Sequence, residues 1–300
     1  MCNYSEQNVV LFSKYFKKEE IIMKKTLLAT LVLSLVVVFA GCSKAETTTE
    51  APADTTAVEE TEADEPVAEA DEAEPVEEAA EETGADSVMT YADYVAADLD
   101  TEVCVEAYVQ AKQSWWEKDG QGVATVYAQD KDGAYFLYNM ACAEEDYDKL
   151  VPGTKIKVTG FKSEWSGEVE IIDASFEIVE GDTFVATAKD VTDLLGKDEL
   201  IDSQNQFVSF KGLTIEAADD NGNAFLYNYD GSGSEGDDLY FNVSLDGNTY
   251  TFTVESYLCD KDSDVYKAVK ELKVGDVVDM EGFLYWYEGV NPHITSVTVQ

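Results

Sequence analysis

The chain has 300 residues, with 20 basic and 62 acidic side chains and a formal net charge of −42. Every basic residue is a lysine, and the only histidine is His293. This composition argues against nucleic acid as a partner, because binding phosphates requires clustered positive charge. A single histidine also argues against histidine catalysis and multi-histidine metal sites. We therefore expect no enzyme, no metal site and no cofactor.

The amino-terminal region has the pattern of a secretory signal over residues 23–41. Two lysines follow Met23, and an uncharged, mostly apolar stretch then runs to Gly41 and is followed by Cys42. A basic start, a short apolar core and small residues before a cleavage site define such signals. Residues 1–22 have mixed charges and no recognisable element, and we interpret them as a mis-called upstream extension of a chain that starts at Met23.

The end of this signal, Phe39-Ala40-Gly41-Cys42, resembles the lipobox of bacterial lipoproteins, although leucine is commoner than phenylalanine at its first position. The resemblance implies cleavage before Cys42, lipidation of its sulfur, and anchoring on the extracytoplasmic face of the bacterial membrane. A simple membrane anchor helix ending at Cys42 is the alternative. Residues 42–87 then form the lipidated cysteine and an acidic tether, which we expect to be disordered because it has no aromatic and almost no β-branched aliphatic side chains to bury.

The remaining chain reads as two copies of one domain, over residues 88–180 and 181–300. Glycines 153, 160 and 167 match glycines 275, 282 and 289 at a constant offset. The second copy carries two insertions, a Gly/Asp/Asn-rich stretch at 218–238 and a longer helix at about 262–273. An internal repeat of this length predicts two similar domains of about 100 residues each.

Each copy predicts the same order of elements. A short helix (about 89–97 or 188–196) precedes a strand, and in copy one Val103, Val105, Ala107 and Val109 alternate as in a half-buried strand. A hairpin follows that turns at Asp132-Gly133 or Asp246-Gly247. A helix, capped in copy two by Ser263, precedes two more strands.

The pattern predicts a mainly β protein with two tandem five-stranded barrels, each with a short helix between strands three and four. It resembles the OB-fold, and "VYAQDKDGAYFLY" is similar to the second and third strands of secreted bacterial OB modules. An immunoglobulin-like sandwich is the alternative, and the interposed helices speak against it.

The OB-fold resemblance implies a ligand cleft across strands two and three, between the loops after strands one and four. Trp115 and Trp116 fall in the first of these loops, and Trp165 falls in the second. The strand alternation directs Tyr127, Gln129, Phe136 and Tyr138 into the cleft. Copy two places Tyr285, Trp286 and Tyr287 near its own loop after strand four. The alternative is that the tryptophans cap the barrel or pack between the domains.

Other patterns favour ordinary structural roles. The segment 219–230 partly matches a calcium loop but lacks its glycine and glutamate, so a plain turn at 220–223 is favoured. A stripe of Lys155, Lys157 and Lys162 is interpreted as a solvated strand face. His293 is interpreted as a hydrogen-bonded surface residue. Three cysteines in the globular part, Cys104, Cys142 and Cys259, are interpreted as unpaired thiols.

These observations favour a membrane-anchored, non-catalytic binding lipoprotein that recognises a glycan or another neutral ligand through aromatic side chains. Two alternatives stay open. One is single-stranded nucleic-acid binding, which rests on the fold resemblance and is opposed by the charge. The other is a structural or assembly lipoprotein that docks a protein partner. The sequence leaves the oligomeric state open.

Overall fold

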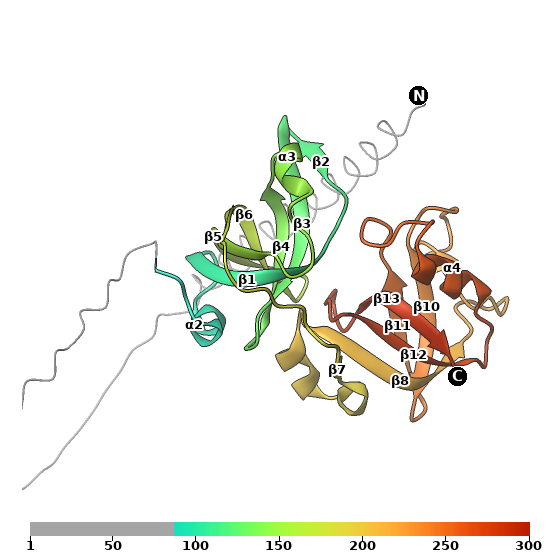
Figure 1. The fold of residues 1–300 in the computed structure, drawn as a ribbon. Coiled ribbons are helices and arrows are strands. Elements are labelled where there is room, and N and C mark those ends of the chain that lie inside the picture. The colour runs from blue at the N-terminus through green and yellow to red at the C-terminus, as the bar shows by residue number, and fades with distance from the viewer. Residues whose placement is uncertain (1–86) are drawn as a thin grey trace, which may run out of the picture. The chain divides into compact units, whose positions relative to one another are not determined.

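The computed structural model describes residues 87–300, which lie within one compact unit, Val76–Gln300. The expected signal, Cys42 and all but the last residue of the tether lie outside the described residues. The described chain forms two β-barrels, coloured cyan to green and yellow to red in Figure 1. We refer to them as barrel 1 and barrel 2.

Barrel 1 is closed by five strands, which are β1 (Glu102–Lys112), β3 (Gln121–Gln129), β4 (Ala134–Ala141), β5 (Lys155–Trp165) and β6 (Glu168–Ile178). A short strand β2 (Trp116–Lys118) extends the edge of β3. The order around the barrel is β1-β3-β4-β6-β5 and back to β1. Only the contact between β4 and β6 is parallel. This is the OB-fold order, in which strand three meets strand five.

Barrel 2 repeats this order with β8 (Phe207–Glu216), β10 (Leu239–Leu245), β11 (Asn248–Val254), β12 (Val277–Phe283) and β13 (His293–Val299). Two short strands, β7 (Lys189–Asp190) and β9 (Leu226–Tyr227), lie at its edges. The pairing of β11 with β13 is again parallel. The predicted pair of OB-fold barrels is therefore confirmed, and the sandwich alternative is excluded by the closed strand order.

The helices between strands three and four are also confirmed. They are α3 (Glu144–Tyr147) in barrel 1 and α4 (Asp264–Glu271) in barrel 2, where the Ser263 side chain accepts a hydrogen bond from the Tyr266 amide. The first predicted helix forms as α2 (Tyr91–Ala96), which Thr90 caps. The helix predicted at 188–196 is wrong. There β7 pairs with β8, and the 3₁₀ turns η1 (Thr192–Leu194) and η2 (Asp198–Ser203) follow.

The failed helix has a local cause. The Asp190 carboxylate accepts hydrogen bonds from both the amide (3.1 Å) and the hydroxyl (2.7 Å) of Thr192. Such a local side-chain bond offers the backbone an alternative to a helix. The Gln110 side chain also fixes the chain just before this segment. Its Nε2 donates to the Phe184 carbonyl (3.1 Å), and its Oε1 accepts a hydrogen bond from the Ala186 amide (2.8 Å).

Alternating side chains fill both barrels as the sequence predicts. Val103, Val105, Ala107 and Val109 are each at most 1% exposed and pack in the core of barrel 1. The core of barrel 2 contains Phe210, Phe241 and Phe252. A third buried cluster lies between the barrels and joins Tyr127 and Phe136 of barrel 1 to Phe283 of barrel 2. This third cluster covers the outward side of β3 and β4 in barrel 1.

The predicted lysine stripe does not form one solvated face. Lys162 is only 7% exposed, and its ammonium donates to the carbonyls of Tyr94 (3.0 Å), Val95 (2.9 Å) and Ala97 (2.7 Å) at the end of α2. A cation at a helix carboxyl end satisfies carbonyls that have no partner within the helix. Lys155 instead pairs with Glu106 at 2.8 Å. The interpretation of Lys162 as solvated is therefore wrong.

Candidate ligand-binding site

The face of barrel 1 that would hold a ligand in an OB-fold is covered by barrel 2. Tyr127 and Phe136 point away from the core of barrel 1, as their strand positions predict, yet they are 0% and 3% exposed. The Tyr127 ring stacks on Phe283 of barrel 2, with centroids 4.3 Å apart. Phe136 meets Tyr285 edge to face at 5.3 Å. These two predicted cleft residues therefore form an interdomain contact.

Polar groups at the border of this contact are also paired across the barrels. The Tyr127 hydroxyl lies 2.6 Å from His293 Nδ1, and Gln129 Oε1 accepts a hydrogen bond from the Phe207 amide at 2.8 Å. Burial lowers the pKa of His293 to about 3, so its imidazole is neutral at pH 7. His293 is 8% exposed and stacks on Tyr285. Its interpretation as a surface residue is wrong, although the expected hydrogen bond is present.

The two neighbouring tryptophans have different environments. Trp115 packs against the core of barrel 1, and its Nε1 donates to the Cys142 carbonyl at 2.9 Å. A Cβ atom at Gly122 would lie 2.6 Å from the Trp115 ring, so this ring sits directly on the β3 backbone. Trp116 is 37% exposed. The Ser114 amide before them donates to the Tyr257 carbonyl (2.9 Å), which fastens the loop to barrel 2.

The loops after the fourth strand of each barrel meet and present aromatic side chains to solvent. The Trp165 and Tyr287 rings have centroids 5.1 Å apart and are 37% and 38% exposed. The Glu288 amide donates to the Ser166 carbonyl at 2.7 Å, which joins the two loops. The Trp286 side chain, in the barrel 2 loop, packs against the core of barrel 2 and over Gly167 of the barrel 1 loop.

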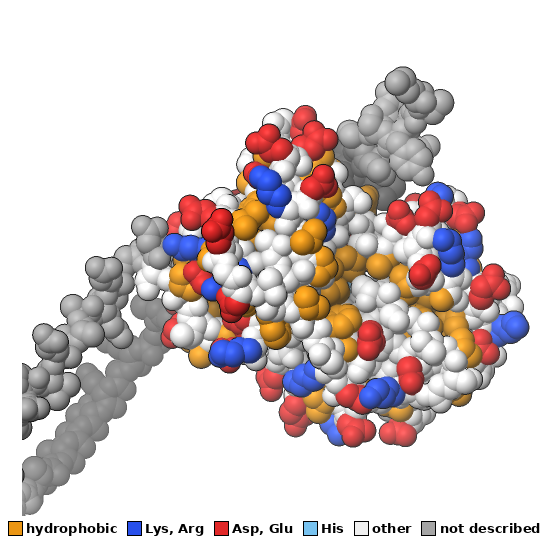
Figure 2. Space-filling view, viewed as in Figure 1, with side chains coloured by type: hydrophobic (Ala, Val, Ile, Leu, Met, Phe, Trp, Pro, Cys, Tyr) orange, Lys and Arg blue, Asp and Glu red, His pale blue; other side chains and the backbone are white. Residues whose placement is uncertain are grey.

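Two further aromatic rings extend this meeting point. Tyr138 stacks beside Phe136 with centroids 6.4 Å apart, and Phe136 contacts Tyr285. Both tyrosines are half-buried. We call Tyr138, Trp165, Tyr285 and Tyr287 the junction aromatics. Figure 2 shows hydrophobic side chains gathered along the surface between the two barrels.

A buried carboxyl group lies directly beneath the junction aromatics. Glu168 is 0% exposed, and its Oε2 accepts hydrogen bonds from the Trp286 amide (2.8 Å) and from Gln204 Nε2 (3.2 Å). Burial raises the pKa of Glu168 to about 8, and the nearby Glu170 adds to this effect. Sequence analysis missed Glu168, because one acid among 62 carries no signal of its own.

Two other buried acids border the same region. Burial raises the pKa of Glu170 to about 7 and that of Glu255 to about 8. Glu255 accepts hydrogen bonds from the amides of Tyr257 (3.2 Å) and Leu258 (2.9 Å). Because burial raises the pKa of all three carboxyl groups, the contact region carries less negative charge at neutral pH than three ionised carboxylates would give it.

The corresponding face of barrel 2 has a different character. Its outward positions on β10 and β11 include Tyr240, Asn242 and Thr251, and none is buried. Thr251 Oγ1 donates to Asn242 Oδ1 at 2.8 Å, and Thr253 Oγ1 donates to Asn291 Oδ1 at 2.8 Å. This face is polar and uncharged, and it leads through Asn291 to the loop that carries Tyr285 and Tyr287.

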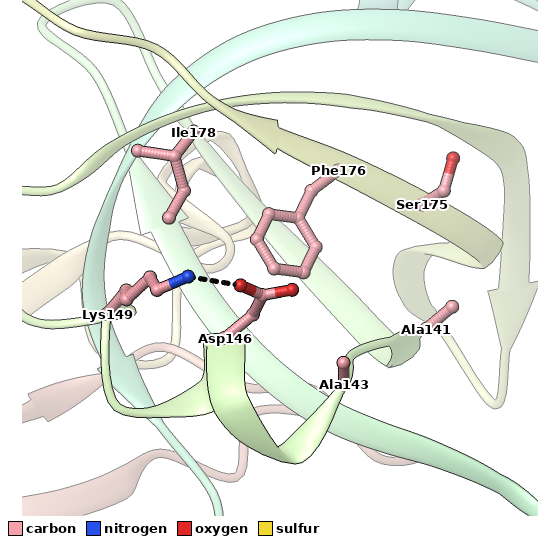
Figure 3. Close-up of a pocket in the computed structure, with 7 residues that line it drawn as sticks. All are labelled: Ala141, Ala143, Asp146, Lys149, Ser175, Phe176 and Ile178. Carbon is pink, nitrogen blue, oxygen red and sulfur yellow. Dashed lines mark hydrogen bonds and ion pairs between the residues drawn. The ribbon is translucent and has the colours of Figure 1, made fainter.

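A separate pocket of about 340 Å³ lies on barrel 1, between α3 and the end of β6. Figure 3 shows the Phe176 ring pointing toward the Asp146 carboxylate, which is paired with Lys149 at 2.6 Å. The junction aromatics do not line this pocket. Since its two charged groups neutralise each other, it offers less to a ligand than the exposed rings at the junction.

The remaining candidate sites have structural explanations. Asp219 accepts hydrogen bonds from the amides of Asn221 and Asn223, both at 3.0 Å, which makes the favoured plain turn. Among residues 87–300 no cluster of histidine, cysteine and acidic side chains is arranged to hold a metal ion. The cysteines at 104, 142 and 259 have free thiols. Within the same residues, no helix has the length and apolar character needed to cross a membrane.

No protein-family model and no curated protein matches the chain. Among solved structures, the p204 HINb domain is 12% identical with a TM-score of 0.32, over 68% of this chain and 100% of that domain. A murine DNA-binding protein bound to double-stranded DNA is 13% identical with a TM-score of 0.32, over 65% and 97%. A replication protein A heterotrimer bound to single-stranded DNA is 11% identical with a TM-score of 0.27, over 66% and 49%. Likeness at this level carries no argument about ligands, and the OB-fold assignment rests on the strand pairing.

Proposed function

We propose that this chain is a membrane-anchored, non-catalytic binding protein whose junction aromatics hold a neutral ligand, with carbohydrate as the first class to test. The observation that supports the proposal is the pair of Trp165 and Tyr287. Each ring is more than a third exposed, and the pair is built from the corresponding loop of each barrel. Large exposed aromatic side chains that meet at a domain junction are typical of binding sites.

The surroundings of the pair favour an uncharged ligand over an anionic one. Glu164 and Glu288 flank the two rings in sequence and are exposed, and the chain as a whole carries a net charge of −42. Such a field repels nucleic acids and other polyanions. The apolar face of a sugar packs on an aromatic ring, while its hydroxyl groups donate hydrogen bonds to carboxylates.

The direct test is a titration of the purified full-length chain, followed by tryptophan fluorescence, with neutral cell-wall and dietary oligosaccharides. We expect a saturable change for at least one glycan, and an affinity at least tenfold weaker in Trp165→Ala and Tyr287→Ala. Tyr229→Ala is the matched control, since this tyrosine is 75% exposed and lies outside the junction aromatics. Equal affinity in Trp165→Ala and the unmodified protein would contradict the proposal.

The same titration separates the two other functional classes. Single-stranded DNA that binds at low salt and dissociates at high salt would favour nucleic-acid recognition, since such binding releases counterions. A glycan and DNA panel that leaves fluorescence unchanged would favour the docking of a protein partner. In that case Trp165→Ala should weaken capture of that partner.

The membrane anchor rests on the sequence Phe39-Ala40-Gly41-Cys42, and it is tested independently of the ligand. Expression in a bacterium should place the chain in the membrane fraction, and mass spectrometry should find acyl chains on Cys42. Cys42→Ala should release the protein or leave its signal uncleaved. A soluble, unacylated protein with Cys42 intact would overturn this part of the proposal.

A further inference from the structure

Two buried oxygen atoms beneath the junction aromatics have no hydrogen-bond partner. They are Glu168 Oε1 and Asn205 Oδ1, which belong to side chains 0% and 4% exposed. The Asn205 side chain lies beside Glu168, because its Nδ2 donates to the carbonyl of the next residue, Val169. Buried polar atoms are rarely left unpaired, because each has lost its hydrogen bonds to water without a replacement. Two acceptors cannot bond to each other unless one of them carries a proton.

We propose that Glu168 is a positioning residue, held as a neutral carboxylic acid whose Oε1 hydroxyl donates to Asn205 Oδ1, and that this proton fixes the two loops carrying Trp165 and Tyr287. A protonated carboxyl has one donor, and the amide oxygen of Asn205 is an acceptor. One proton therefore satisfies both orphaned atoms. One N–H of the Asn205 amide donates to the Val169 carbonyl at 3.1 Å, which fixes which end of this amide is nitrogen and which is the acceptor Oδ1.

The titratable groups that face Glu168 are Glu170 on β6, Tyr94 on α2, Tyr127 on β3 and Tyr285 from the barrel 2 loop. Burial favours the neutral form of Glu168, Glu170 adds to it, and together they outweigh the hydrogen bonds from Gln204 and the Trp286 amide and the neighbouring Asn205 amide, which favour the charged form. None of these side chains can supply a positive charge. Desolvation without a cationic partner raises the pKa of a carboxyl group, and the pKa of Glu168 is raised to about 8.

The position of Glu168 ties this proton to the binding surface. It follows Trp165, Ser166 and Gly167 in the barrel 1 loop, and it accepts the amide of Trp286, the residue before Tyr287. Gln204 Nε2 bridges the Gly167 carbonyl (2.8 Å) and Glu168 Oε2. Loss of the proton would leave a buried carboxylate without a cation, and opening of the junction would relieve this cost. The use of these loops for binding rests on the proposed function, whereas the proton itself does not.

The test measures hydrogen exchange at the Trp286 and Glu288 amides in the full-length protein, without ligand, at a series of pH values. The pKa of Glu168 is raised in the closed junction and returns to about 4.5 when the junction opens. The closed form is therefore most favoured below about pH 4.5, and its advantage is lost as the pH rises to about 8. We expect protection factors to fall by up to about tenfold per pH unit in this window and then to level off.

Glu168→Gln gives the decisive comparison, because its amide can donate to Asn205 and accept from Trp286 at every pH. Protection of the two amides should then become nearly independent of pH. Glu255→Gln is the matched control, since it removes another buried carboxyl of raised pKa and should leave the profile at Trp286 unchanged. Identical profiles in Glu168→Gln and the unmodified protein would overturn the proposal.

A second measurement stands even if Glu168→Gln does not fold. The ¹³C shift of the Glu168 carboxyl in the unmodified protein reports its titration directly, and we expect a midpoint above pH 7. A midpoint near 4.5 would overturn the proposal. Because neither measurement uses a ligand, failure of glycan binding would leave this result intact, and a failure here would leave the Trp165 test intact.

Discussion

The outward faces of strands two and three differ between the two barrels, although the strand order is the same. In barrel 1 this face carries Tyr127 and Phe136 and is buried against barrel 2. In barrel 2 it carries Tyr240, Asn242 and Thr251, none of which is buried, and it becomes buried only at Thr253. The comparison shows that the fold sets the direction of a side chain, whereas the kind of side chain decides whether that face binds another domain.

This difference also relocates the candidate site. Barrel 2 lies where an OB-fold would hold a ligand on barrel 1, and both bordering loops of barrel 1 are fastened to it through Ser114 and Ser166. Two aromatic side chains at the edge of this contact, Trp165 and Tyr287, remain exposed. The ligand surface that we propose is therefore built by both barrels and is not a cleft on one of them.

The largest loss of stability is expected from a substitution in the buried face of barrel 1. Tyr127→Ala removes a ring that is 0% exposed, stacked on Phe283 and hydrogen-bonded to His293. Loss of a buried aromatic ring lowers the free energy of unfolding by about 3–5 kcal/mol, and the buried His293 imidazole, left without its hydrogen-bond partner, adds to this loss. Tyr240→Ala, at the corresponding face of barrel 2, should cost about 1 kcal/mol or less. Urea unfolding of both variants measures the difference, and equal losses would contradict the contrast between the faces.

Acid should weaken the same contact through His293. Its pKa is lowered by burial to about 3, so the folded protein holds it neutral while an unfolded chain binds a proton near pH 6.5. The contribution to stability is fully present above pH 6.5 and is lost as the pH falls toward 3. The unfolding constant should rise by up to about tenfold per pH unit in this window.

The control for acid sensitivity is His293→Gln, whose amide oxygen can still accept from the Tyr127 hydroxyl. Its unfolding should depend less on pH between about 6 and 4 than that of the unmodified protein. Glu168, Glu170 and Glu255 shift stability the opposite way, because their raised pKa values favour the folded state at lower pH. Parallel pH profiles for His293→Gln and the unmodified protein would rule out His293 as the acid-sensitive group.

The barrels could be predicted from the sequence because their strands, turns and helix caps depend on residues that are close together in the chain. The alternation from Val103 to Val109, the Asp-Gly turns and the cap at Ser263 each depend on neighbours in sequence, and all three are found as expected. The helix predicted at 188–196 failed because the Asp190 side chain bonds to Thr192, which competes with a helix at the same short range.

The contact between the barrels could not be predicted from these local patterns. Tyr127 and Phe136 were assigned to the correct face, but the sequence does not say that Phe283 and Leu258 cover them. The same limit applies to His293 and Lys162, which looked exposed because their buried partners are distant in sequence. Tyr127 is 166 positions from His293, and the Tyr94 carbonyl is 68 positions from Lys162.

A smaller effect is expected from the cap of α4, the helix that distinguishes barrel 2. Ser263→Ala removes the side-chain acceptor for the Tyr266 amide and should destabilise the protein by about 1 kcal/mol. Ser263→Asp keeps an acceptor at this position and should restore most of the loss. Thermal or urea unfolding measures both, and a Ser263→Ala variant as stable as the unmodified protein would show that the cap contributes nothing.

The smallest expected effect tests the corresponding helix of barrel 1. The four-residue α3 begins after Ala143, which is exposed and has the extended backbone of a capping residue (φ −66°, ψ 146°) but offers no side-chain acceptor. Ala143→Ser supplies that acceptor where the backbone already suits it, and should stabilise the protein by a few tenths of a kcal/mol to about 1 kcal/mol. Ala143→Val, which has no acceptor, is the control and should give no gain. If both variants behave alike in urea unfolding, the missing cap is not what limits the length of α3, and the next feature to test is the turn at Val151–Thr154 that leads into β5.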